Sequence, residues 1–205
     1  TAFGDITHQL PCQMSVVTFT GLIGHDQKGI GLHLDNERPG GISLNRFEGT
    51  DISGFRIGVY VSDAIIGSKC DTNWFWFSFI RQCKTCIWEK GNRVDDNVWF
   101  VNVDATVPDG VGIRTAADYG KWYVIMGTYR YEGRNRAMIL DPGASHNVVE
   151  MHPPYDDYFA CENNSGNDSN LILSTTKPGF RPWPRTPDEA RSDGREPNEL
   201  ILNGD

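Results

Sequence analysis

The chain has 205 residues, of which 39% are hydrophobic and 11% aromatic, and its formal net charge at pH 7 is −8. This length predicts one domain, or one domain with an appendage, that buries its own hydrophobic core. The acidic balance argues against nucleic acids and anionic membranes as partners, and the absence of an apolar run near the roughly 20 residues of a bilayer-spanning helix predicts no membrane span.

Hydrophobic and polar residues alternate along much of the chain, which is typical of half-buried strands. In chain order, this pattern predicts strands at Met14–Ile23, Ile42–Phe47, Phe55–Ser62, Trp74–Ile80, Asn97–Asp104, Trp122–Tyr131, Arg136–Leu140, Asn147–Met151 and Leu171–Ser174. Gly133 predicts a hairpin turn between the strands on either side of it. The segment Trp74–Phe79 is apolar on both faces, which predicts a central strand covered on both sides.

Short strands separated by turn residues at this spacing predict a mainly β fold, an antiparallel β-sandwich or jelly-roll-like barrel. We expect residues 1–152 to form the β-rich core. Seven of the eleven prolines lie from Pro153 onward, so residues 153–205 are predicted to form an irregular, proline-rich C-terminal arm that packs on the core. Thr186-Pro187 is the best candidate for the start of a helix, and this helix is predicted to have only one or two turns.

The cysteines and two glycosylation sequons indicate an extracellular protein. The sequons, at Asn163 and Asn167, lie in one polar loop, and the chain begins at Thr1, so we expect a secreted protein whose signal peptide has been removed. Five cysteines predict two disulfides of unknown pairing and one spare thiol, which offers a route to a homodimer. The cysteines are Cys12, Cys70, Cys83, Cys86 and Cys161.

A metal site is one candidate for chemistry. His33 and Asp35 lie two residues apart, so on a strand both side chains point to the same side. With His146 or His152 as a third ligand they would form the two-histidine, one-carboxylate set of jelly-roll oxygenases. A metal ion is therefore the cofactor that this sequence admits, although a histidine and an aspartate at the surface give the same pattern.

Aromatic residues near turns indicate a binding surface. Aromatic rings stack on the apolar faces of sugars, while neighbouring polar side chains read the hydroxyl groups. Tyr129, Arg130 and Tyr131 are the best exposed candidates, and Trp122 is included with them. The same rings are also typical of a core, so their exposure decides between the two interpretations.

The sequence therefore predicts a secreted binding protein whose partner is a glycan or another cell-surface ligand. A toxin or effector that acts on another cell is one form of this prediction. The alternative is a secreted metal-dependent or hydrolytic enzyme on a jelly-roll scaffold, and enzymatic activity stays undecided. Acids for glycoside hydrolysis, which needs two carboxylates across a cleft, are Glu132, Glu150, Asp156 and Asp157. A structural module that pairs through the odd cysteine is a third class.

Overall fold

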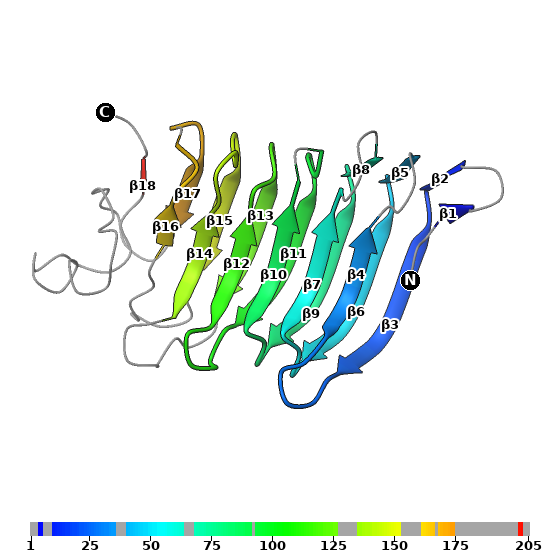
Figure 1. Cartoon of the computed structure of the whole chain (residues 1–205), viewed down its shortest axis with the longest axis horizontal. Helices are drawn as coiled ribbons and strands as arrows, with labels where there is room; N and C mark the ends of the chain where they lie inside the picture. The colour runs from blue at the N-terminus through cyan, green and yellow to red at the C-terminus, as the bar shows by residue number, and fades with distance from the viewer. Residues whose placement is uncertain are drawn as a thin grey trace, which may run out of the picture.

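The computed structural model describes residues 4–5, 10–35, 40–63, 68–91, 93–126, 135–152, 161–166, 168–174 and 201–202. In this part of the chain the strands wind into a parallel β-solenoid of about five turns (Figure 1). The prediction of an antiparallel sandwich or jelly-roll barrel is therefore wrong. Apart from the short antiparallel pairs β1–β2 and β17–β18, each strand pairs with the strand one turn later and not with its neighbour in sequence. The sequence pattern predicted alternation correctly and strand pairing wrongly.

Three sheets run along the solenoid in the described part of the chain. Sheet 1 contains β3 (Val16–Ile23), β6 (Arg46–Ser53), β9 (Trp74–Arg81), β11 (Val98–Asp104), β13 (Lys121–Met126), β15 (Val148–His152), β17 (Leu171–Ser174) and β18 (Ile201–Leu202). Sheet 2 contains β4 (Ile30–Asp35), β7 (Ile57–Ser62), β10 (Thr85–Lys90), β12 (Val111–Thr115), β14 (Arg136–Leu140) and β16 (Cys161–Asn163). Sheet 3 contains β1 (Gly4–Asp5), β2 (Leu10–Gln13), β5 (Gly40–Ser43) and β8 (Ser68–Asp71).

The pairing is parallel throughout sheets 1 and 2, except where β18 meets β17. Residues that stack in successive turns are 23 to 30 positions apart. β13 lies in sheet 1 and β14 in sheet 2, so the predicted hairpin around Gly133 is also wrong. Because the turn length varies, the chain shows no fixed repeat.

The core lies between sheets 1 and 2, and its largest side chains form a stack across sheet 1. Phe47, Phe75, Trp99 and Trp122 are fully buried. Their ring centroids are 5.1, 3.9 and 5.2 Å apart in that order, and each pair is nearly parallel. We call this stack the inner aromatic ladder. Each ring comes from a different turn, so the ladder joins successive turns through the interior.

A second ladder, of buried asparagines, lines one corner of the solenoid. Asn45 donates from Nδ2 to Oδ1 of Asn73 at 3.2 Å, and Asn73 donates in the same way to Asn97 at 3.2 Å. Farther along, Asn147 donates to Asn170 at 2.9 Å. The residues before these asparagines include Leu44, Thr72, Asp96 and His146, all with positive φ. Stacked side-chain amides satisfy the backbone groups that the corner leaves unpaired.

Gly120 interrupts the asparagine ladder between Asn97 and Asn147. The side-chain amide of Asn97 donates instead to the carboxyl group of Glu89. Glu89 is fully buried. It accepts hydrogen bonds from Asn97 Nδ2 at 3.2 Å and Trp99 Nε1 at 2.8 Å, and Thr115 Oγ1 lies 3.3 Å from its other oxygen. Burial raises the pKa of this carboxyl from 4.5 to about 7, and the three hydrogen bonds oppose the shift.

The predicted disulfides are wrong for the four cysteines whose side chains are described. Cys70, Cys83, Cys86 and Cys161 are all buried, and none is paired. They act as small apolar core residues; Cys70, for example, donates to Ser62 O at 3.1 Å. Burial raises the pKa of the Cys161 thiol to about 12. The side chain of Cys12 lies outside the described residues.

The predicted C-terminal arm is partly solenoid. β16 pairs with β14, and β17 pairs with β15, so the regular stacking continues to Ser174. Residues 175–200, with the helix start at Thr186, lie outside the described residues. Nowhere in the described ranges is there a helix with the length and apolarity needed to cross a bilayer.

Candidate functional site

Large apolar side chains are exposed together on the outer face of sheet 1. Trp74 is 52% exposed, Trp76 is 53% exposed and Tyr123 is 42% exposed. Ile125 and Val148 continue the patch along β13 and β15. A soluble protein that exposes a contiguous set of large apolar groups generally uses them to bind a ligand or partner.

Three of the rings on this face form an outer aromatic ladder. The sheet register places Phe100 opposite Trp76 on one side and opposite Tyr123 on the other. The centroids of Trp76 and Phe100 are 5.1 Å apart, and those of Phe100 and Tyr123 are 4.9 Å apart, with planes only 6° from parallel in the second pair. Strand spacing in a sheet is about 4.8 Å, so the ladder follows the solenoid axis.

A β-bulge enlarges this face. The register between β9 and β11 shifts between Val101 and Val103. As a result Ser78 and Phe79, which are neighbours in sequence, are both exposed, and the alternation along β9 breaks at this point. A bulge places two residues opposite one and redirects a side chain, so here it adds both a hydroxyl group and a ring to the outer surface.

Two shallow, open grooves lie on either side of the Trp76 ring. The N-terminal groove, of about 250 Å³, is lined by Thr18, Phe19, Arg46, Glu48, Gly49, Thr50 and Trp76. The C-terminal groove, of about 400 Å³, is lined by Trp76, Phe77, Ser78, Phe100, Val101, Asn102, Tyr123, Ile125 and His152. Hydroxyl groups therefore stand beside the rings in both grooves, and the C-terminal groove adds the amide of Asn102 and the imidazole of His152, so both grooves offer groups that donate and accept hydrogen bonds.

The charged groups near the grooves are paired with one another. Arg46 forms an ion pair with Glu48, and its guanidinium lies 5.9 Å from the centre of the Trp76 ring. His152 Nε2 lies 3.0 Å from Glu150 Oε1. The charges of Arg46 and Glu48, which line the N-terminal groove, therefore balance each other.

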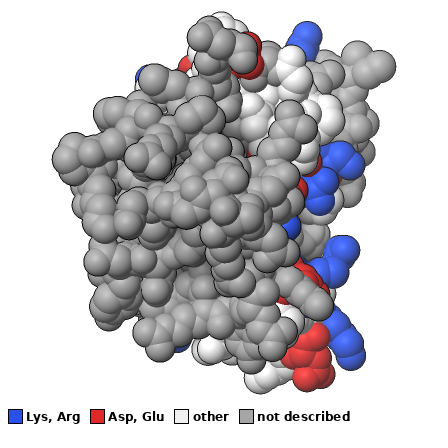
Figure 2. All heavy atoms as spheres, turned by 90° about the vertical axis from the view of Figure 1, so that its left-hand side faces the viewer, with Lys and Arg blue, Asp and Glu red and all other residues white. Residues whose placement is uncertain are grey.

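The outer face of sheet 2 also carries a row of rings, but its composition differs. Tyr60 lies between His33 and Trp88, with centroid distances of 5.1 and 5.4 Å. Arg114 covers Trp88 at 4.9 Å and makes a two-point contact with Asp141 at 2.7 and 3.0 Å. Seen from the β16 end, basic and acidic side chains lie side by side along one edge of the molecule (Figure 2). Trp88 in this row is therefore covered by cationic side chains of this chain, Arg114 and Lys90.

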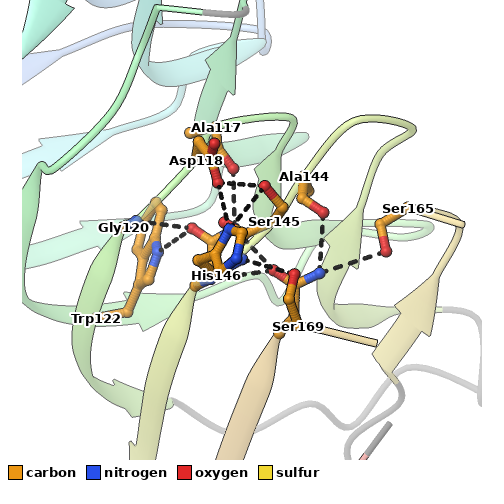
Figure 3. Close-up of polar contacts among 11 residues, drawn as sticks. Ala117, Asp118, Gly120, Trp122, Ala144, Ser145, His146, Ser165 and Ser169 are labelled. Carbon is orange, nitrogen blue, oxygen red and sulfur yellow. Dashed lines mark hydrogen bonds and ion pairs between the residues drawn. The ribbon is translucent and has the colours of Figure 1, made fainter. Parts of the chain in front are cut away.

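A serine, a histidine and an aspartate meet at one corner of the solenoid (Figure 3). His146 Nδ1 lies 3.1 Å from Asp118 Oδ1 and 3.2 Å from Ser145 Oγ, and Ser145 Oγ also donates to Asp118. A nucleophilic triad needs the serine and the aspartate on opposite nitrogens of the imidazole. Here both contact Nδ1, so the cluster holds the corner together and does not activate the serine.

The structure does not bring the predicted metal ligands together. His33 Nε2 lies 3.6 Å from Asp35 Oδ2 on β4. His146 follows β14, which is four strand intervals from β4 in sheet 2, or about 19 Å at ordinary strand spacing. His152 lies on the outer face of sheet 1. Within the described ranges, no group of three or more His, Cys, Asp or Glu side chains is arranged to hold a metal ion.

Of the predicted ligand-binding residues, Trp122 is described and lies in the core. It is fully buried, and its indole stacks on Trp99, so it cannot meet a ligand at the surface. Tyr129, Arg130 and Tyr131 lie outside the described residues. Among the candidate acids, Glu150 is described and contacts His152, whereas Glu132, Asp156 and Asp157 are not described.

The sequon residue Asn163 is exposed at the end of β16. Its Oδ1 accepts a hydrogen bond from Ser165 Oγ at 2.6 Å. Asn167, in the second sequon, lies outside the described residues, and glycosylation of both sites stays a prediction.

Sequence reasoning missed the outer aromatic ladder because β9 is aromatic on both sides. Trp74 and Trp76 alternate with Phe75 and Phe77, and such a strand was expected to be covered on both faces. The structure covers one face only. The available signal lay in the tryptophans, whose N–H group favours a position at a wet surface over a dry interior.

No protein-family model, curated protein or solved structure matches this chain. The outer face of sheet 1, through its geometry and chemistry, is therefore the basis for the function proposed below.

Proposed function

We propose that this protein is an extracellular glycan-binding protein and that the glycan lies on the outer face of sheet 1. The observation that carries the proposal is the exposed outer aromatic ladder with a polar-lined groove on each side of Trp76. Aromatic rings contact the apolar faces of sugars, and hydroxyl, amide and imidazole groups bind the sugar hydroxyls. Both kinds of group occur here within one surface.

The shape of the site supports a ligand that lies along the surface. The grooves are open and shallow, whereas a small-molecule pocket encloses most of its ligand. The ladder is built on strands of a parallel sheet, so its rings are held in a row before any ligand arrives. Such a preformed surface loses little conformational entropy on binding.

A glycan array followed by titration calorimetry tests the proposal. Trp76→Ala and Tyr123→Ala are each expected to weaken binding of the best array ligand about tenfold, because a stacked ring contributes roughly 1.5 kcal/mol. Tyr119→Ala is the matched control. Tyr119 is 48% exposed, close to the 42% of Tyr123, but lies at a solenoid corner against His146, so this variant should bind as the parent does.

Thermal unfolding of each variant checks that the fold is intact. A chain that binds no glycan on the array contradicts the proposal, and so does an equal loss of affinity in Tyr119→Ala and Tyr123→Ala. The extracellular location rests on the two sequons. A fall in mass after enzymatic removal of N-glycans from protein secreted by eukaryotic cells supports it, and no change counts against it.

A further inference from the structure

The position of Trp76 joins the two grooves into one tract. Trp76 lines both the N-terminal and the C-terminal groove. The lining residues begin at Thr18 on β3 and end at His152 on β15, which are separated in sheet 1 by β6, β9, β11 and β13. Five intervals of about 4.8 Å give the tract a length of about 24 Å along the solenoid axis.

The charges of the tract disfavour an acidic ligand. Arg46 lies against Glu48, and the His152 imidazole lies against Glu150. An acidic sugar would have to displace these contacts to reach either side chain, and it would meet the glutamates at the same place. A neutral sugar needs only donors and acceptors, which Asn102 and the neighbouring hydroxyl groups provide.

We infer that the ligand is a neutral, extended oligosaccharide or polysaccharide chain that lies along the solenoid axis and occupies both grooves by crossing Trp76. This inference rests on the proposed glycan-binding function and adds the charge of the ligand, its direction and its minimum length. A chain that fills one groove meets only part of the tract, so affinity is expected to rise with chain length until both grooves are filled.

Calorimetry with oligosaccharides of increasing length tests the inference. The neutral probes are glucose, mannose and N-acetylglucosamine oligosaccharides from the disaccharide to the hexasaccharide, together with any neutral array ligand. The acidic probes are hexasaccharides of galacturonate and of heparin. We expect a neutral hexasaccharide to bind at least about tenfold more tightly than its trisaccharide, and to lose less than about twofold in affinity at high salt.

Thr50→Tyr places a ring in the N-terminal groove, where Thr50 is exposed on β6. This variant is expected to lower the affinity for the neutral hexasaccharide to that for the trisaccharide. The trisaccharide is expected to keep its affinity, because the C-terminal groove holds it between Tyr123 and Asn102. Unchanged trisaccharide binding also shows that the variant is folded.

The outcomes separate the inference from the function on which it rests. Equal affinities for the trisaccharide and the hexasaccharide, an equal effect of Thr50→Tyr on both, or preferential binding of the acidic probes overturns the inference and leaves glycan binding standing. Absence of binding to every probe and to the array overturns both.

Discussion

Two aromatic ladders run through the same strands of sheet 1, one on each side. On β11, Trp99 belongs to the inner aromatic ladder and Phe100, the next residue, belongs to the outer one. Trp99 is fully buried and donates its indole N–H to Glu89 at 2.8 Å. Phe100 stacks on its neighbours and borders an open groove. Similar residue types in a similar stack therefore fill the core on one side of the sheet and border open grooves on the other.

The difference lies in what covers each ladder. Side chains of sheet 2 cover the inner ladder, so its removal would leave a cavity. In the described part of the chain the outer ladder has a groove above it, so its rings are free to meet a ligand. The inner ladder is part of the core, and binding is the role that we propose for the outer ladder. Mutations in each ladder test this division.

The largest effect is expected from the neighbouring pair Trp99→Ala and Phe100→Ala. Trp99→Ala should lower the free energy of unfolding by about 3–5 kcal/mol, because it removes a buried ring and one of the three hydrogen-bond donors of Glu89. Phe100→Ala should lower it by about 1 kcal/mol or less and weaken glycan binding instead. Urea denaturation measures both. Comparable losses of stability would show that the outer ladder also holds the fold.

The second prediction concerns the carboxyl group beside the inner ladder. Glu89 has a folded-state pKa of about 7, above its ordinary value of 4.5. Between these values the folded protein binds one more proton than the unfolded chain, so the free energy of unfolding falls as the pH rises through this window. The shift corresponds to a loss of about 3 kcal/mol at pH values above about 7.

Glu89→Gln keeps an oxygen that can accept from Trp99 and Asn97 and removes the charge. It should raise the free energy of unfolding at about pH 8 by up to about 3 kcal/mol and flatten its dependence on pH. Urea denaturation across this pH range is the measurement. Glu150→Gln on the outer face is the control, with a change below about 1 kcal/mol. If Glu89→Gln keeps the full pH dependence of the free energy of unfolding, that dependence comes from other groups.

The smallest effect is expected from a single added methyl group. A Cβ at Gly120 would lie 2.5 Å from Asn147 Oδ1 and 2.6 Å from Trp122 Nε1. Gly120→Ala should therefore cost about 1–3 kcal/mol of stability, because the inner ladder has no room for it. At Gly21 on β3 the nearest atom would be 3.5 Å away, so Gly21→Ala should be neutral or slightly stabilising. Thermal unfolding measures both variants. Equal unfolding temperatures would show that the inner ladder rearranges to accommodate the added methyl group.

Several of the strands were predicted from the sequence, whereas β4, β10, β12 and β16 were not. Arg136–Leu140 and Leu171–Ser174 were predicted with the bounds that the structure has, and Trp74–Ile80 and Asn97–Asp104 differ from β9 and β11 by one residue at one end. Alternation is a local property, and residues two apart on a strand share a face whatever the strand pairs with. The pairing itself joins residues 23 to 30 positions apart, which local alternation does not encode.

One sequence signal of the solenoid was present. An asparagine stands directly before a strand of sheet 1 at Asn45, Asn73, Asn97, Asn147 and Asn170. These positions are unequally spaced, and Gly120 replaces the asparagine in one turn, so the series does not form a fixed repeat. An asparagine that precedes each alternating segment is typical of a corner residue, and this pattern would have indicated stacked turns.

By itself the sequence determined that this protein is rich in strands, acidic and aromatic, because composition and alternation are properties of the chain alone. The tertiary structure decided which rings are buried. Trp122 was taken for a surface residue and is covered by the core, while Trp74 and Trp76 were taken for covered residues and are exposed. The physical reason is that exposure depends on what packs against each side of a sheet, and in a solenoid that partner is a strand from another part of the turn.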